Sequence, residues 1–451
     1  MSETHDLILK GGTVVLPGRT VKADVAARDG RISAIGTLSD AKAERVIDCA
    51  GLHVLPGVID SQVHFREPGL EHKEDLESGT RAAILGGVTA IFEMPNTTPA
   101  TDNEAALEDK LARAAAKAWC DHAFFLGASS DNAEQLGAWE RRDGCAGVKI
   151  FMGSSTGSLL VDQDDAIRRV LAGGFRRVAV HCEDEARLKE RKPLIADGAP
   201  VSMHPEWRDV ETAVNATRRL IALARETGRK VHVLHITTAE EMEILRDARD
   251  VATVEVTPQH LTLAAPECYE GLGSFAQMNP PIRDARHRAG LWWGLEQGIA
   301  DVIGSDHAPH TRKEKSQDYP KSPSGMPGVQ TLVPVMLNHV SAGKLTLERF
   351  VDMTSAGPAR VYDIAGKGRI AAGYDADFTV VDLGAEKEIT NDWIASKCGW
   401  TPFHGLTVRG WPMMTIIRGR MVMRDGEVLG KPQGKPVRFH PLPPAPLSSG
   451  V

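Results

Sequence analysis

Short apolar runs alternate with longer amphipathic stretches through most of this chain. Eight of the runs have the length and the β-branched content of buried strands, and they cover Val54–Asp60, Thr89–Met94, Ala123–Leu126, Gly147–Met152, Arg177–His181, Lys230–His235, Thr253–Thr257 and Val302–Asp306. The stretches after these runs have apolar residues at helical spacing, and they cover Asp75–Leu85, Asn103–Trp119, Ala133–Glu140, Asp162–Leu171, Trp207–Glu226, Ala239–Arg249, Asp284–Gln297 and Val329–Val340. Because strands that alternate with helices pair in parallel through right-handed crossovers, the pattern predicts an α/β fold, a (β/α)8 TIM barrel over residues 55–369.

The two ends of the chain have a different pattern, short strands separated by glycine turns. Residues 6–50 contain several such strands, and after Arg360 they return at 376–382, 414–418 and 421–424, the last two joined as a hairpin through Gly419 and Arg420. We expect residues 1–54 and 370–451 to form one small discontinuous β domain, with residues 431–451 as a proline-rich extended tail on the surface. An open doubly wound sheet is the alternative to the barrel, but the glycine-rich phosphate loop typical of that fold is not found.

Composition excludes several classes of partner. Of the 451 residues 42% are hydrophobic and 25% are charged, and the net charge is −7 with no long basic run. This profile is typical of a soluble protein and disfavours nucleic acid or an anionic membrane as a partner. The six cysteines are scattered without a C-x-x-C pair, and the first residues do not resemble a secretory signal, so we expect a reduced, cytoplasmic protein that binds a small molecule.

Residues that bind metals follow several of the predicted strands. Gln62, His64 and Arg66 alternate beyond the first strand, Lys149 lies in the fourth, and the fifth, sixth and eighth end at His181, His235 and Asp306. In a TIM barrel these strand ends meet at one mouth, and imidazoles with a carboxylate suit zinc. Each residue alone also has an ordinary explanation, such as a local hydrogen bond, an outward-pointing lysine or a helix cap, but their coincidence on several strands favours a metal site.

Longer motifs around these residues resemble the amidohydrolase superfamily, and within it the dihydroorotases of the long type, over nearly the whole chain. The motifs are Pro56-Gly57-Val58-Ile59-Asp60, His64-Phe65-Arg66-Glu67-Pro68-Gly69, Met94-Pro95-Asn96-Thr97, Met278-Asn279-Pro280-Pro281-Ile282-Arg283, Asp306-His307-Ala308-Pro309-His310 and Gly373-Tyr374-Asp375-Ala376-Asp377. Together they are specific, whereas the last one alone marks only the superfamily.

The resemblance implies a role for each site residue. One or two zinc ions would be surrounded by Gln62, His64, Lys149, His181, His235 and Asp306. Lys149 would be N-carboxylated, since a carbamate can bridge two cations and an amine cannot. Asp306 would be both a metal ligand and the general base. Arg66, Asn96 and His310 would hold a substrate carboxylate, and Asn279 with the backbone around Pro327-Gly328 would hold the ring amide.

These roles predict a cyclic amidohydrolase that interconverts L-dihydroorotate and N-carbamoyl-L-aspartate in pyrimidine biosynthesis. Arg66 favours a substrate with a carboxylate, because its planar guanidinium donates two hydrogen bonds to such a group. Hydantoins, dihydropyrimidines and allantoin lack that carboxylate. An allantoinase-like or hydantoinase-like amidase remains an alternative, and Arg66 is also explained by a surface salt bridge with Glu67 or Glu71.

Two positions depart from the family pattern. Gln62 stands where the first histidine of a His-x-His pair is usual, and Gln259 stands where a histidine is common. An amide oxygen is a weaker zinc ligand than imidazole, so a non-catalytic homologue that acts as an assembly partner is a further alternative. The other site residues are retained, which favours an enzyme over a non-catalytic homologue. We also expect the protein to form a homo-oligomer. The polar segment 313–323 is interpreted either as a mobile loop over the mouth or as an ordinary solvated connection.

Overall fold

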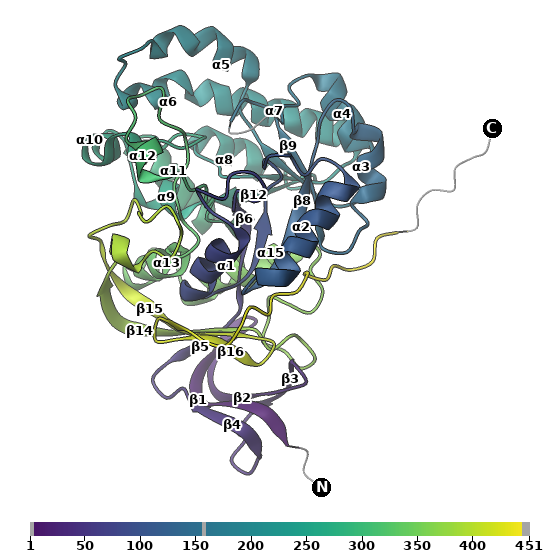
Figure 1. Ribbon diagram of the computed structural model, residues 1–451, viewed down its shortest axis with the longest axis vertical. Coiled ribbons are helices and arrows are strands. Elements are labelled where there is room, and N and C mark those ends of the chain that lie inside the picture. Colours follow the sequence, from purple (N-terminus) through teal and green to yellow (C-terminus); the bar gives the residue numbers. More distant parts are fainter. Residues whose placement is uncertain (1–3, 156–158, 444–451) are drawn as a thin grey trace, which may run out of the picture.

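Eight parallel strands form the centre of the molecule in the computed structural model, which describes residues 4–155 and 159–443 (Figure 1). They follow one another in the sheet in chain order and are β6 (Val58–Val63), β7 (Val88–Glu93), β8 (Asp121–Gly127), β9 (Cys145–Phe151), β10 (Val178–His181), β11 (Val231–Val233), β12 (Ala252–Val256) and β13 (Val302–Ile303). The first and last strands meet where the His64 backbone N–H donates to the His307 carbonyl at 2.7 Å. The predicted (β/α)8 barrel is therefore confirmed.

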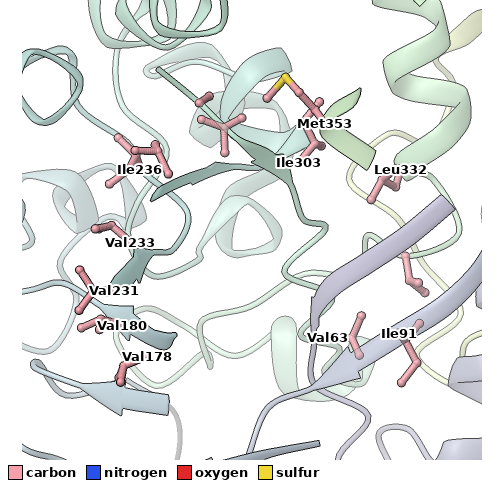
Figure 2. Packing of buried hydrophobic residues seen from close by; sticks show 14 of the residues in the cluster. Val63, Ile91, Val178, Val180, Val231, Val233, Ile236, Ile303, Leu332 and Met353 are labelled. Carbon is pink, nitrogen blue, oxygen red and sulfur yellow. The ribbon is translucent and has the colours of Figure 1, made fainter. Parts of the chain in front are cut away.

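Along each barrel strand, one side chain faces the surrounding helices and the next faces the barrel interior. Val178 and Val180 of β10 pack in the large core between strands and helices, together with Val231 and Val233 of β11 (Figure 2). Ala179, which lies between the two valines, faces inward and pairs in register with Lys149 of β9. Because side chains of a strand alternate between faces, this register places Lys149 inside the barrel.

The helices predicted from the sequence are confirmed with small shifts at their ends: α1 (Leu76–Leu85), α2 (Glu104–Lys117), α3 (Ala133–Trp139), α4 (Asp164–Ala172), α7 (Val210–Thr227), α8 (Ala239–Arg246), α11 (Ala285–Glu296) and α13 (Leu332–Ser341). Several begin where a side-chain oxygen accepts from a backbone N–H of the first turn, as Asp75, Asn103, Asp209, Thr238 and Asp284 do, which is why the chain starts a helix there.

Short helices that the sequence did not predict lie in the loops and after α13. They are α5 (Glu185–Arg191), α6 (His204–Trp207), α9 (Pro258–Thr262), α10 (Glu267–Leu272), α12 (Arg312–Lys315), α14 (Leu347–Val351) and α15 (Gly357–Val361). A π-helical turn over Asp352–Ala356 joins the last two. No helix in the described ranges combines the length and the apolar character needed to cross a membrane.

A second sheet lies beside the barrel, against α13 and α1, at the bottom of Figure 1, and it draws strands from both ends of the chain. From the first part come β1 (His5–Leu16), β2 (Arg19–Arg28), β3 (Arg31–Gly36), β4 (Ala43–Asp48) and β5 (His53–Pro56), and from the last part come β14 (Phe378–Glu388), β15 (Thr407–Ile417), β16 (Arg420–Arg424) and β17 (Glu427–Val428). β15 and β16 form the predicted hairpin. We propose that these strands form one discontinuous β domain distinct from the barrel, with its divisions close to the predicted residues 54 and 370.

The single strand predicted over Val54–Asp60 is wrong, because the structure divides it into β5 and β6. β5 belongs to the second sheet, where it pairs with β1 and β14, and β6 belongs to the barrel. Gly57 lies between them and donates its N–H to the Asp377 carbonyl at 2.8 Å. A Cβ at this position would lie 2.3 Å from Thr89 Oγ1 and 2.8 Å from Asp377 Cβ, so only glycine fits at this passage between the two sheets.

The tail predicted for residues 431–451 is extended and mostly exposed over 431–443, as expected, but two of its side chains are held against the barrel. Lys435 and Val437 exchange backbone hydrogen bonds with His122 of β8. The Val437 side chain is buried among inward-facing barrel residues, and Phe439 packs on Phe92. Residues 433–440 therefore close the end of the barrel opposite its mouth, and residues 444–451 lie outside the described ranges.

Candidate active site

The carboxyl ends of the barrel strands surround a small cavity that contains nearly all the site residues proposed from the sequence. Those that line it are Gln62, His64, Arg66, Asn96, Lys149, His181, His235, Asn279 and Asp306. His310 lies behind this wall, with its Nε2 at 3.3 Å from Arg66 Nη2. Residues from seven strands and their loops thus meet in one place, as the barrel geometry predicts.

Two imidazoles face each other on one side of the cavity. His181 Nδ1 lies 3.1 Å from His235 Nε2, and the other ring nitrogen of His181 lies 2.9 Å from Glu183 Oε2. A carboxylate only accepts hydrogen bonds, so Glu183 holds the proton on Nε2 and leaves the Nδ1 lone pair of His181 directed at the cavity. Carboxylate partners of this kind orient histidines that bind metals.

Glu183 is itself fixed by a buried ion pair with Arg208. Burial by itself would raise the pKa of Glu183, but Arg208 and His181 lower it to about 2. The carboxylate therefore stays charged and able to accept from His181. The sequence signal for Glu183 was its spacing of two from His181, which keeps both side chains on one side of the chain.

A second pair lies across the cavity, where His64 Nε2 is 3.2 Å from Asp306 Oδ1. The Nδ1 of His64 lies 2.7 Å from Asn96 Oδ1, so Asn96 orients this ring. Gln62 Nε2 donates to the same Asp306 oxygen at 3.1 Å. The buried Gln62 Oε1 has no hydrogen-bond partner among the described residues, so the amide leaves an acceptor atom unused beside the second pair.

Lys149 lies between the two pairs and is fully buried. Its Nζ is 4.6 Å from the centre of the Phe151 ring, and no carboxylate among the described residues lies within 4.0 Å of it. Burial lowers the pKa of Lys149 to about 8, although Asp306 and Glu255 act in the opposite direction. An amine buried without an ion-pair partner is unusual and distinguishes Lys149 from Lys110, whose Nζ lies 2.7 Å from Glu93.

Arg66 is also buried without a carboxylate partner in the part of the chain that the structure describes. Its guanidinium donates to the Pro309 carbonyl at 3.2 Å and is directed at the cavity. The alternative of a surface salt bridge with Glu67 or Glu71 is wrong, because Glu67 pairs instead with Lys117 and Arg113. A buried cation without an anion is costly, which makes this wall of the cavity a place for a negatively charged group.

Lys73, which the sequence did not indicate, supports His310 from behind. Lys73 Nζ lies 3.2 Å from His310 Nδ1, and His310 Nε2 lies 3.0 Å from the Ser324 carbonyl. An ammonium only donates and a carbonyl only accepts, so these two contacts place the proton of His310 on Nε2, where Ser324 accepts it. The Arg66 Nη2 donor, 3.3 Å from the same nitrogen, then needs another acceptor. Lys73 also pairs with Glu314 of α12 at 3.0 Å.

Three of the candidate residues have a left-handed backbone that only glycine adopts easily. The φ angle is 66° at Arg66, 37° at His235 and 45° at Asp306. Such angles cost a non-glycine residue about 1 kcal/mol or more. They persist where the surrounding structure holds them, as tends to happen at functional sites.

The donor set fits a metal ion on the side of His181 and His235. A nitrogen of each imidazole lies at the cavity, the two 3.1 Å apart, and Asp306 and Lys149 line the same cavity. Among the described residues, no three His, Cys, Asp or Glu side chains stand together as a ready metal site, since the donors fall into two pairs and the others are Lys149 and Gln62. The second position fits less well, because there the Gln62 amide takes the place of an imidazole.

The structure also shows where Gln259 and the polar segment 313–323 lie relative to the cavity. Gln259 does not line the cavity; its Nε2 donates at 2.8 Å to the carbonyl of Ser305, so it braces the chain just before Asp306. The polar segment 313–323 is not an ordinary solvated connection. The buried Lys315 at its start donates to the Gln277 and Pro323 carbonyls at 3.0 and 2.8 Å, which fastens this segment over the cavity wall.

Comparison with known sequences gives relatives over nearly the full length. Residues 53–422 match the amidohydrolase family. The chain is 38% identical to a dihydroorotase of Halobacterium salinarum, over 97% of this chain and 100% of that one. It is 34% identical to a dihydroorotase of Pyrococcus furiosus, over 94% of each chain.

Comparison with solved structures gives the same architecture. An L-hydantoinase (dihydropyrimidinase) from Arthrobacter aurescens superposes with a TM-score of 0.91 at 29% identity, over 96% of this chain and 99% of that one. A dihydropyrimidinase from Brevibacillus agri superposes with a TM-score of 0.87 at 28% identity, over 95% and 97%. The similarity therefore extends over both the barrel and the second sheet.

Proposed function

The chain belongs to the amidohydrolase family, and from that premise we propose that it is a dihydroorotase, which interconverts L-dihydroorotate and N-carbamoyl-L-aspartate. The observation that carries this choice is Arg66, a guanidinium buried at the cavity without a carboxylate partner among the described residues. A substrate carboxylate would supply that partner through two parallel hydrogen bonds. Neutral rings such as hydantoin, dihydrouracil and allantoin would leave the charge unpaired.

Arg66, Asn96 and His310 bind the carboxylate in this proposal. The His310 Nε2 proton, which the Ser324 carbonyl accepts in this structure, lies next to Arg66 Nη2, so a carboxylate bound there would replace that carbonyl as the acceptor. Asn96 holds His64 through Nδ1 and joins the carboxylate site to the ligand set. Asn279, on the opposite side, binds the ring amide.

We assign the metal position to His181, His235, Asp306 and Lys149 as its carbamate, with His64 and Gln62 at a second position. A zinc ion held there supplies Lewis acidity, which polarises an amide carbonyl and makes water a better acid. Asp306 takes the proton of the attacking water and returns it to the ring nitrogen as the C–N bond breaks and the C–O bond forms. Gln62, which donates to Asp306 Oδ1 at 3.1 Å, keeps the carboxylate directed into the cavity.

The proposed function is tested with a panel of substrates. We expect the purified, zinc-loaded protein to open dihydroorotate with a kcat/KM at least about tenfold above those for hydantoin, dihydrouracil and allantoin, a margin that corresponds to about 1.4 kcal/mol. Production of N-carbamoyl-L-aspartate is measured directly, and the reverse reaction is followed at acidic pH. A preference for a neutral ring would contradict the proposal. It would favour the hydantoinase-like alternative, the class to which the superposed solved structures belong.

Gln62 predicts that the two metal positions differ in affinity. Zinc prefers imidazole nitrogen to an amide oxygen, so mild chelation of the unaltered protein should leave about one zinc per chain. Gln62→His should raise the retained zinc toward two per chain, because the new imidazole would lie on the same side of the strand end as His64. Elemental analysis gives the count without an assay of activity. Two equally tight zinc ions in the unaltered protein would contradict this interpretation.

The matched control for that experiment is Gln259→His. This glutamine is buried close by but braces Ser305 and does not line the cavity. The substitution should leave zinc retention unchanged. An equal gain from both substitutions would mean that added imidazole, and not its place at the second position, raises the count.

A further inference from the structure

A chain of three hydrogen-bonded side chains leads away from the cavity wall formed by Asn279. His204, the first residue of α6, is buried, and its Nε2 lies 3.0 Å from Asn279 Oδ1 and 2.9 Å from the Met278 carbonyl. Its Nδ1 lies 3.2 Å from the Tyr319 hydroxyl. The three residues come from the loops that follow β10, β12 and β13.

The position of the His204 proton follows from these partners. The Met278 carbonyl only accepts a hydrogen bond, so Nε2 must carry the proton and donate. Nδ1 then has the lone pair and accepts from the Tyr319 hydroxyl. Burial lowers the pKa of His204 to about 3, so the ring is neutral and this arrangement holds at neutral pH.

The same proton fixes the orientation of the Asn279 amide. A side-chain oxygen and nitrogen are hard to tell apart by shape, but only the oxygen accepts from His204 Nε2. The amide nitrogen is therefore on the other side, where Asn279 Nδ2 lies 3.5 Å from Ser155 Oγ. Asn279 and Ser155 both line the cavity, so Asn279 presents N–H donors to it.

We infer that His204 is a positioning residue that keeps Asn279 as a donor, so this wall of the site takes a carbonyl oxygen of the cyclic substrate and not a ring N–H. The inference deepens the proposed function and rests on it for the identity of the ring. It makes the wall selective, because a donor that faces a ring N–H would leave two polar groups unpaired in a buried site. Tyr319 holds the other ring nitrogen and links this orientation to the segment that carries His310.

Substitutions at Asn279 test the orientation. Asn279→Asp replaces the cavity-facing nitrogen with an oxygen while His204 continues to donate to the other one. We expect KM to rise by about 5- to 100-fold, the range for a lost or unsatisfied buried hydrogen bond, and to rise further than in Asn279→Ala. An Asn279→Asp enzyme as good as the unaltered one would overturn the inference.

Substitutions at His204 test the positioning role. His204→Leu removes the donor, and His204→Gln retains an N–H at nearly the same place, so KM should rise with leucine and return most of the way with glutamine. In the Asn279→Ala background His204→Leu should add little, since there is no amide left to orient. Additive effects, or a glutamine variant as poor as leucine, would mean that His204 only fastens the loops and would overturn the inference.

The matched control is His339→Leu, which removes a buried imidazole of α13 that bonds to Thr262 and does not line the cavity. It should leave KM unchanged. If His204→Leu does not fold, the glutamine variant and the Asn279 series still decide the question.

The KM measurements on the Asn279 and His204 variants use whichever ring of the panel the unaltered protein opens fastest. They therefore remain valid if the substrate is not dihydroorotate. A protein that opens none of the rings contradicts the proposed function alone. The inference is then decided by nitrogen NMR of histidine-labelled protein, which reports the protonated nitrogen directly. A neutral His204 with its proton on Nε2 supports the inference, and a proton on Nδ1 overturns it.

Discussion

Arg66→Met is expected to lower kcat/KM for dihydroorotate by tens to thousands of fold. The guanidinium is buried, and no carboxylate among the described residues forms an ion pair with it, so we propose that the substrate supplies that partner. Loss of a charge-assisted bond to a buried carboxylate costs about 2–5 kcal/mol, which corresponds to that range. Steady-state rates at several substrate concentrations measure it, and melting temperatures show whether the variant is folded.

Two further variants separate the effect of the Arg66 charge from that of its planar shape, and both from the general effect of removing a buried arginine. Arg66→Lys keeps the charge but loses the planar pair of donors, so it should recover only a part of the activity. Arg176→Met removes another buried arginine, one that stacks on Phe439 at 4.6 Å at the closed end of the barrel, and it should leave the preference among substrates unchanged. If Arg66→Met retains activity within a factor of about three, the carboxylate does not bind there.

The barrel was predictable because its signal is repeated. Each apolar run is followed by a helix, and the register of one strand does not depend on the details of the next. Gln62, His64, Lys149, His181, His235 and Asp306 were predictable for the same reason, since the end of a barrel strand fixes where the next residue lies. Their convergence on one cavity needs only the closure of the barrel.

The sequence did not reveal features that depend on contacts between distant segments. The run from His53 to Ile59 is continuous in hydrophobicity, and it breaks at Gly57 because Thr89 and Asp377 leave no room for a side chain there. Val437 and Phe439 are isolated apolar residues among prolines, and they are buried only because the end of the barrel is open to them. No local pattern contains this information.

The residues that orient the site were missed for a related reason. Lys73 lies in a turn before α1 and His204 begins the short helix α6, and the position of each depends on packing between loops. Each acts on a residue far away in the chain, Lys73 on His310 and His204 on Asn279. Their roles follow from which atoms can donate and which can accept, and that argument requires coordinates.

Lys149 leads to the prediction with the largest effect. A buried amine without a carboxylate partner in the described structure, set between two pairs of metal-binding side chains, is well placed to react with carbon dioxide. The resulting carbamate would exchange an unpaired positive charge for a negative group that two cations can share. We therefore expect Lys149→Ala to be inactive, to retain less zinc, and to recover some activity when a small carboxylic acid such as acetate or propionate is added.

Carbon-13 NMR of zinc-loaded protein prepared with labelled bicarbonate detects the carbamate directly. The unaltered protein should give one carbamate signal, and Lys149→Ala should lack it. Lys315→Met is the matched control, because Lys315 is equally buried but its ammonium already donates to the Gln277 and Pro323 carbonyls. That variant should keep the signal. A zinc-loaded, active protein without any carbamate signal would remove the bridging role from Lys149, and the metal position would then depend on His181, His235 and Asp306 alone.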